Sequence, residues 1–257
     1  MFTCKLRFCY PPWVQMTQKK EPRRIMAYER TSLKPGWVNA DLLASFYEDT
    51  DYLRIIGFFM IHAFRQNRSS KGKTIMDYGW PKDVWKNTAS VSLKDELLYV
   101  ADLHMRNPVC DAVTREPVSE ENFVVCQSLE NMSDACHRAG IQKDFTRTRS
   151  ENRIAVYNSE KNIILSVFDH IRNALAHGRF TIYTDGFIAF ESGMKVKVDN
   201  KDMFDVRARM MLKKETIMRW IAIIESGRLD EDVVNEIEDK RVEAKNDRKQ
   251  KQKQKRK

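Results

Sequence analysis

The stretch DHIRNALAHGRF, residues 169–180, places three hydrogen-bonding side chains within six residues near the end of a predicted helix. They are Arg172, Asn173 and His177. A histidine can take up or release a proton near neutral pH, and an arginine can stabilise negative charge that develops on a phosphate. An amide four residues before the histidine lies on the same helix face, where it can orient the ring. These residues suit cleavage of RNA by its own 2′-hydroxyl, which needs a base, an acid and a cation but no metal.

One chain supplies a single histidine and a single arginine in this motif, so a complete set of acid, base and cation requires a second copy. On a helical wheel, Ala176 lies between Arg172 and His177, away from the apolar face of the helix. A small residue there lets a second helix approach closely, and a two-fold axis brings the same patch of both chains together. We therefore expect a homodimer through the helix 159–177.

The same residues also have a simpler interpretation. Cations in the last turn of a helix complement the partial negative charge of the exposed carbonyl groups, and Gly178 is the usual residue where a helix ends. Under this interpretation Arg172 and His177 serve only the helix end. Asp169 and His170, just before the motif, are expected to be solvated.

The run RNALAH, residues 172–177, resembles the motif of the HEPN superfamily, the higher eukaryotes and prokaryotes nucleotide-binding domains. Many members are metal-independent ribonucleases that act as dimers in toxin–antitoxin, abortive-infection and CRISPR-linked defence. The resemblance implies that Arg172 is the motif arginine, Asn173 the polar residue and His177 the motif histidine. It also implies an endoribonuclease without a cofactor and with a cognate antitoxin or inhibitor protein. Inactive members keep similar folds, so the alternative is a non-catalytic module that binds nucleotide, RNA or a partner protein.

Helical periodicity dominates the chain before the motif ends. Helices are expected over 40–48, 52–66, 93–106, 120–139 and 159–177. Ser92, Ser119 and Ser159 are the expected N-caps of the last three, and Gly140 ends the helix that begins after Ser119. The segment 143–153 reads as a basic lead-in to the motif helix. Its cations are the expected substrate-binding residues: Lys143, Arg147, Arg149 and Arg153.

After Gly178 the apolar period changes from helical to alternating, which indicates strands. RFTIYT and FIAFES flank the turn pair Asp185-Gly186 and predict a hairpin, and a further alternation through Phe204 suggests a third strand. A last helix ends at Gly227. The expected fold is therefore mainly α with a small β meander: a HEPN-like helical bundle over 37–227, with a two- or three-stranded antiparallel sheet at about 179–211 and a further helix.

The two ends of the chain differ from this middle part. Residues 1–36 are turn-rich and should form an arm, whereas 228–257 should be a charged helix or a disordered basic tail. The net charge of +9 is concentrated in residues 240–257, which hold ten Lys and Arg and two acidic residues. We expect this tail to attract RNA through its phosphates.

Composition limits the compartment and the chemistry. Lys5 and Arg7 interrupt the first apolar residues, and the longest apolar run, IIGFFMIHAF, is too short to span a bilayer. The five cysteines are scattered without CxxC spacing, which favours reduced thiols over disulfides or zinc. We expect a cytoplasmic protein with no membrane contact, no metal and no cofactor.

Overall fold

The structure is a computed structural model of the chain, and it describes residues 49–62, 73–85, 90–104, 121–142, 150–158, 162–198 and 200–254. Its helices are α1 (Thr50–Gly57), α2 (Leu93–Val100), α3 (Met132–Arg138), α4 (Ile163–Ala176), α5 (Lys214–Ser226) and α6 (Glu231–Gln254). Its strands are β1 (Phe123–Cys126), β2 (Arg153–Tyr157), β3 (Phe180–Ile182), β4 (Phe187–Val198) and β5 (Lys201–Lys213). The expected arm 1–36 and helix 40–48 lie outside the described residues.

The strands form one five-stranded sheet in the order β1-β2-β5-β4-β3. β1 and β2 run parallel, and the other neighbouring pairs run antiparallel. The expected helical bundle is therefore wrong: the chain is an α/β protein built on a mixed sheet. The predicted meander is present as β3, β4 and β5, but it forms only one part of this sheet.

The expected helical bundle is wrong because it does not include strands β1 and β2. The segment predicted as one helix over 120–139 contains strand β1, a short 3-10 turn at Leu129–Asn131 and helix α3. Nearly all side chains of FVVC and RIAVY are buried. A strand buried on both faces shows no polar alternation, so its period cannot be told from that of a buried helix.

Several local predictions are confirmed. Ser92 caps α2, since its hydroxyl accepts the Asp95 N–H at 3.3 Å and the Asp95 carboxylate accepts the Ser92 N–H at 2.9 Å. The hairpin turn lies at Asp185-Gly186, where Gly186 has φ +82°, and α5 ends at Gly227. The predicted cap of the motif helix, Ser159, is wrong: α4 begins at Ile163, and its cap is Asn162, whose side chain accepts the N–H of Ile164 at 2.8 Å.

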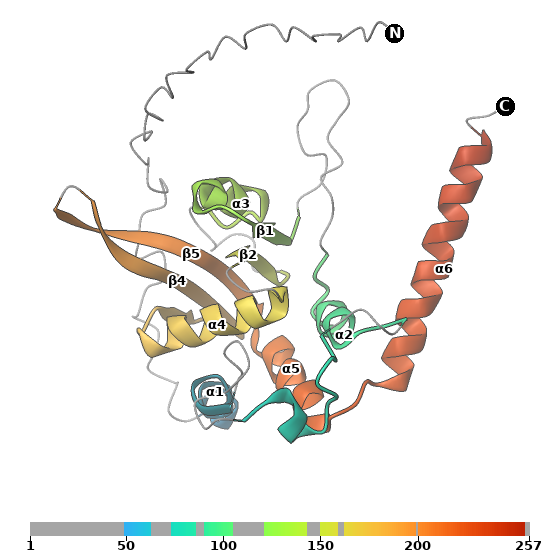
Figure 1. The fold of residues 1–257 in the computed structure, drawn as a ribbon, viewed down its shortest axis with the longest axis horizontal. Helices are drawn as coiled ribbons and strands as arrows, with labels where there is room; N and C mark the ends of the chain where they lie inside the picture. The colour runs from blue at the N-terminus through green and yellow to red at the C-terminus, as the bar shows by residue number, and fades with distance from the viewer. Residues whose placement is uncertain are drawn as a thin grey trace, which may run out of the picture.

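Helices cover both faces of the sheet (Figure 1). On one face, α1, α4 and α5 form the larger core, where the Phe168 ring lies 5.4 Å from Phe59 and 5.9 Å from Trp220. On the other face, α3 packs over β1, β2 and β5. Burial raises the pKa of Cys126 to about 11 and that of Cys136 to about 12, so these core thiols stay protonated.

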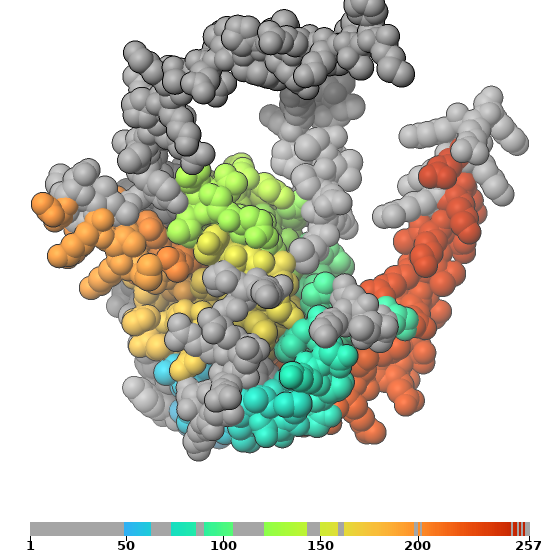
Figure 2. All heavy atoms as spheres, in the orientation of Figure 1, coloured from blue at the N-terminus to red at the C-terminus, as the bar shows by residue number. Residues whose placement is uncertain are grey.

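Two elements stand away from the body: the far end of the β4–β5 hairpin and the C-terminal half of α6 (Figure 2). The first half of α6 is attached to α2, because the Tyr99 hydroxyl donates to Glu236 at 2.6 Å and Arg241 pairs with Asp95 at 3.2 Å. Of the two forms expected for the basic C-terminal segment, the structure has the helix. In the described ranges, none of the helices has the length and apolar composition needed to cross a bilayer.

Candidate functional site

The motif occupies the C-terminal end of α4, which lies against β4 (Figure 1). His177 is the C-cap residue, and its backbone N–H donates to the Asn173 carbonyl at 3.1 Å. Gly178 adopts φ +62°, a left-handed conformation that favours glycine, and Arg179 N–H then returns to the Ala174 carbonyl at 2.8 Å. The helix therefore ends where the sequence predicts.

Arg172 and His177 lie outside the hydrophobic core. Arg172 is half-buried, whereas Ala176 and His177 are exposed. Five positions along the helix place the two side chains about 140° apart around the axis, so they flank one side of the helix end. Within the part of the chain that the structure describes, the His177 ring makes no hydrogen bond.

Asn173 makes a different hydrogen bond from the one expected with the His177 ring. Its amide donates instead to the Asp169 carboxylate, with 3.1 Å between Nδ2 and Oδ2. Asp169 is only 8% exposed. The structure thus gives Asn173 a partner one turn earlier on α4, and among described residues no hydrogen bond joins its amide to His177.

Of the four predicted substrate-binding residues, the structure describes only Arg153. Lys143, Arg147 and Arg149 lie outside the described residues. Arg153 is at the start of β2 and is 5% exposed; its guanidinium donates to the Ala139 carbonyl at 3.1 Å and pairs with Glu151 at 2.7 Å. These contacts hold the guanidinium inside the protein.

His170, which the sequence predicts to be solvated, is buried in the structure. His170 is 3% exposed; its Nε2 lies 3.1 Å from the Tyr157 carbonyl and its Nδ1 lies 3.0 Å from the Ser192 hydroxyl. A carbonyl can only accept, so Nε2 carries the proton and Nδ1 accepts from the serine. The expectation that Asp169 and His170 are solvated is wrong, because this side of α4 packs against the sheet.

A β-bulge places an arginine near this histidine. Ser192 pairs with Ala208 and Gly193 with Val206, which leaves Arg207 as the extra residue of β5. A Cβ on Gly193 would lie 2.3 Å from the Asp205 carbonyl oxygen, so the bulge requires glycine. The single glycine within FESGMKV is the sequence signal that could have predicted the bulge.

Burial is the main cause that lowers the pKa of His170 below its ordinary value. The hydrogen bond to the Tyr157 carbonyl and the charge of Asp169 act in the opposite direction, whereas the charge of Arg207 lowers the pKa further. His170 is therefore neutral at physiological pH and is built into the fold as a hydrogen-bonding group.

This lowered pKa predicts a loss of stability in mild acid. The unfolded chain binds the proton near the ordinary histidine pKa of 6.5, whereas folded His170 resists it. The free energy of unfolding should therefore fall as the pH drops below that value, by up to about 1.4 kcal/mol per pH unit for one proton. Urea unfolding across this range, for the wild type and His170→Gln, measures the difference. Parallel pH profiles for the two proteins would contradict the prediction.

A buried ion cluster anchors the residue that follows Gly178. Glu191 is fully buried and accepts from Arg179 and from Arg209, whose Nη2 lies 3.1 Å away. Arg209 also donates to the Gln142 carbonyl at 2.6 Å, and the Arg179 guanidinium lies 3.9 Å from the centre of the Phe204 ring. The cluster therefore ties the end of α4 to β4, β5 and the end of α3.

Among the described residues, no group of three or more His, Cys, Asp and Glu side chains is placed to hold a metal ion. Comparison with known proteins finds no counterpart: no family model, no curated protein and no solved structure matches this chain.

Proposed function

We propose that this chain is a metal-independent endoribonuclease that uses Arg172 and His177. The observation that carries the proposal is the exposed imidazole of His177, which makes no hydrogen bond to any described residue and follows Arg172 by about one and a half helical turns. The proposal rests on these residues and not on a helical bundle. The same six residues support the likeness to HEPN ribonucleases.

The proposed reaction needs no water. One imidazole removes the proton of a ribose 2′-hydroxyl, and the oxygen attacks the adjacent phosphorus. The bond from phosphorus to the 5′-oxygen breaks, and a second imidazole, protonated at the start, gives its proton to that oxygen. Arg172 stabilises the negative charge on the phosphoryl oxygens. The products are a 2′,3′-cyclic phosphate and a 5′-hydroxyl.

The second imidazole points to a homodimer. His170 of the same helix is buried and hydrogen-bonded on both ring nitrogens, so it cannot serve as the second acid or base. A two-fold pair supplies His177 and Arg172 twice. Every residue from Ile164 to Ile171 is buried within the chain's own fold, so we restrict the proposed contact to the last turn of α4, around the exposed Ala176.

The basic half of α6 is proposed to attract the substrate. This helix extends away from the body, and residues 240–257 contain most of the net charge of the chain. Such charge acts on phosphates of any sequence through counterion release. We further propose a cytoplasmic role in toxin–antitoxin or anti-phage defence, with an antitoxin or inhibitor protein that covers the α4 end.

The proposal predicts RNA cleavage in the presence of a chelator. Full-length protein incubated with total RNA in EDTA should yield fragments that carry 2′,3′-cyclic phosphate ends, because the attacking oxygen belongs to the substrate. Treatment with a phosphatase before and after acid opening of the cyclic phosphate identifies these ends. RNA that is bound but left intact would instead favour the non-catalytic module, and cleavage abolished by EDTA would contradict the mechanism.

A further inference from the structure

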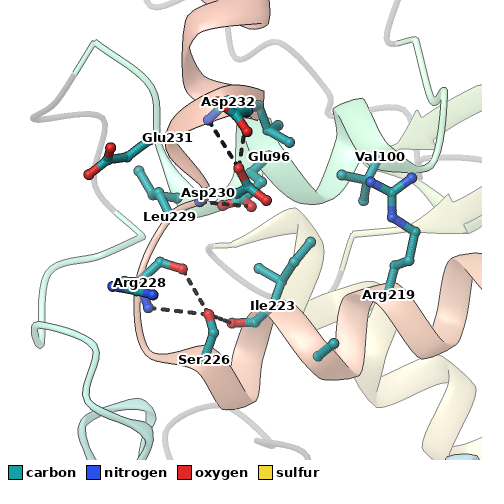
Figure 3. Close-up of a pocket in the computed structure, with 12 residues that line it drawn as sticks. Glu96, Val100, Arg219, Ile223, Ser226, Arg228, Leu229, Asp230, Glu231 and Asp232 are labelled. Carbon is teal, nitrogen blue, oxygen red and sulfur yellow. Dashed lines mark hydrogen bonds between the residues drawn. The ribbon is translucent and has the colours of Figure 1, made fainter.

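A second candidate site lies away from α4, in a pocket between α2, the end of α5 and the start of α6 (Figure 3). The pocket has a volume of about 610 Å³. Val100, Ala222, Ile223 and Leu229 supply apolar parts of its wall, and Glu96 and Asp230 lie together at one end. It is large enough for an aliphatic chain of several carbons.

Glu96 has a buried carboxylate oxygen that a ligand in this pocket could satisfy. It is 1% exposed, and its Oε1 accepts the backbone N–H of Asp230 at 3.3 Å. Its Oε2 is buried, and no described residue donates a hydrogen bond to it. Buried carboxylate oxygens almost always have a donor, because an unsatisfied acceptor loses its bonds to water without replacement. Burial also raises the pKa of Glu96, whereas the hydrogen bond from Asp230 N–H and the charge of Arg219 act in the opposite direction.

The charges around Glu96 favour a cation. Four carboxylates line the pocket, those of Glu96, Asp230, Glu231 and Asp232, against the two guanidinium groups of Arg219 and Arg228. The Asp230 Oδ1 is engaged at the start of α6, where it accepts the Asp232 N–H at 3.0 Å. Arg219 lies at the other end of the pocket, near Val100 (Figure 3). Among the residues that line the pocket, neither guanidinium group donates a hydrogen bond to Glu96.

We infer that this pocket binds a primary alkylammonium group, with the ammonium donating to Glu96 Oε2 and the alkyl chain against the apolar wall. An ammonium is favoured over a guanidinium because only one oxygen of Glu96 is available, whereas a guanidinium prefers to bind both carboxylate oxygens at once. The inference does not depend on the proposed ribonuclease activity, because none of its residues belongs to the α4 motif.

Two sources carry this chemistry: a free aliphatic amine and the side chain of a lysine in another protein. Titration calorimetry on the full chain with butylamine, 1,5-diaminopentane and N-acetyl-lysinamide distinguishes them. Tighter binding of the diamine favours a free amine, and tighter binding of the lysine derivative favours a protein ligand. 1-Butanol, which has the same chain without the charge, should not bind. The absence of binding by all three amines at millimolar concentration would overturn the inference.

Variants test the role of Glu96 itself. Glu96→Gln keeps an acceptor for Asp230 but removes the charge, and should weaken amine binding at least about ten-fold. Glu231→Gln removes an equal charge from an exposed lining residue, and should change the affinity less than about two-fold. Equal effects of the two variants would show general charge attraction only and would overturn the site.

A second variant distinguishes loss of amine binding from a folding defect in Glu96→Gln. Ala222 is exposed on α5 and lines the pocket, so Ala222→Trp should fill the pocket without a change at Glu96. This variant should also abolish amine binding while circular dichroism and the melting temperature stay close to those of the wild type. Unchanged amine affinity in Ala222→Trp would place the binding elsewhere and overturn the inference.

Discussion

His177→Ala should lower the rate of RNA cleavage by on the order of 100-fold or more, because it removes the group proposed to transfer the proton. Arg172→Ala should have an effect of similar size through the loss of charge stabilisation on the phosphate. Both residues lie outside the hydrophobic core, so each variant should fold and accumulate at wild-type levels. Rates of cleavage of a defined RNA oligonucleotide, measured at saturating protein, give the comparison.

His137→Ala is the matched control for this experiment. His137 is also exposed and also lies in the last turn of a helix, α3, but it belongs to no part of the motif. Its removal should leave the rate unchanged within about two-fold. If His177→Ala cleaves RNA as fast as His137→Ala does, the histidine serves only the helix end and the non-catalytic alternative is favoured.

Arg209→Met should reduce the free energy of unfolding by about 3–5 kcal/mol, because it removes one of the two arginines that pair with the fully buried carboxylate of Glu191. The substitution also deprives the Gln142 carbonyl of its donor. Equilibrium denaturation in urea, with the same probe for both proteins, measures the loss. Methionine replaces the aliphatic part of the arginine side chain, so the change removes mainly the guanidinium group.

Arg54→Ala provides the comparison at the surface. Arg54 pairs with Glu225 at 2.7 Å, but the two side chains are 50% and 41% exposed. Water already solvates both charges, so this variant should lose no more than about 1 kcal/mol. Losses of equal size in Arg209→Met and Arg54→Ala would contradict the structural role assigned to the buried cluster.

The sequence predicts those elements whose burial is one-sided. The motif helix, the hairpin at Asp185-Gly186 and the last helix before Gly227 all show a period that matches their structure. β1 and β2 are nearly all buried, so their sequences have no such period. The pairing of β1 with β2 and of β2 with β5 joins distant parts of the chain, and no local pattern specifies such contacts.

The candidate site also has features that the sequence predicts and features that it does not predict. The position of Arg172 and His177 at the helix end follows from helical geometry and from Gly178. The partner of Asn173 is Asp169, four residues earlier on the same helix, so helical geometry also accounts for it. The burial of Arg153 and the contact between His170 and Ser192 depend instead on how α3 and α4 pack on the sheet. The β-bulge beside Ser192 does have a local signal in the sequence, the glycine at position 193.

The order of strands in the sheet also constrains the order of folding. β3, β4 and β5 follow one another along the chain and pair through short turns, which form on the microsecond scale. Ala155 of β2 pairs with Arg209 of β5 across a segment that contains all of α4, β3 and β4, and closing such a loop has a large entropic cost before any contact compensates for it. The meander and α4 should therefore form the folding nucleus, and β1 and β2 should join after the rate-limiting step. The end of α4 would then be in place early, while the sheet that buries His170 and Arg153 is still incomplete.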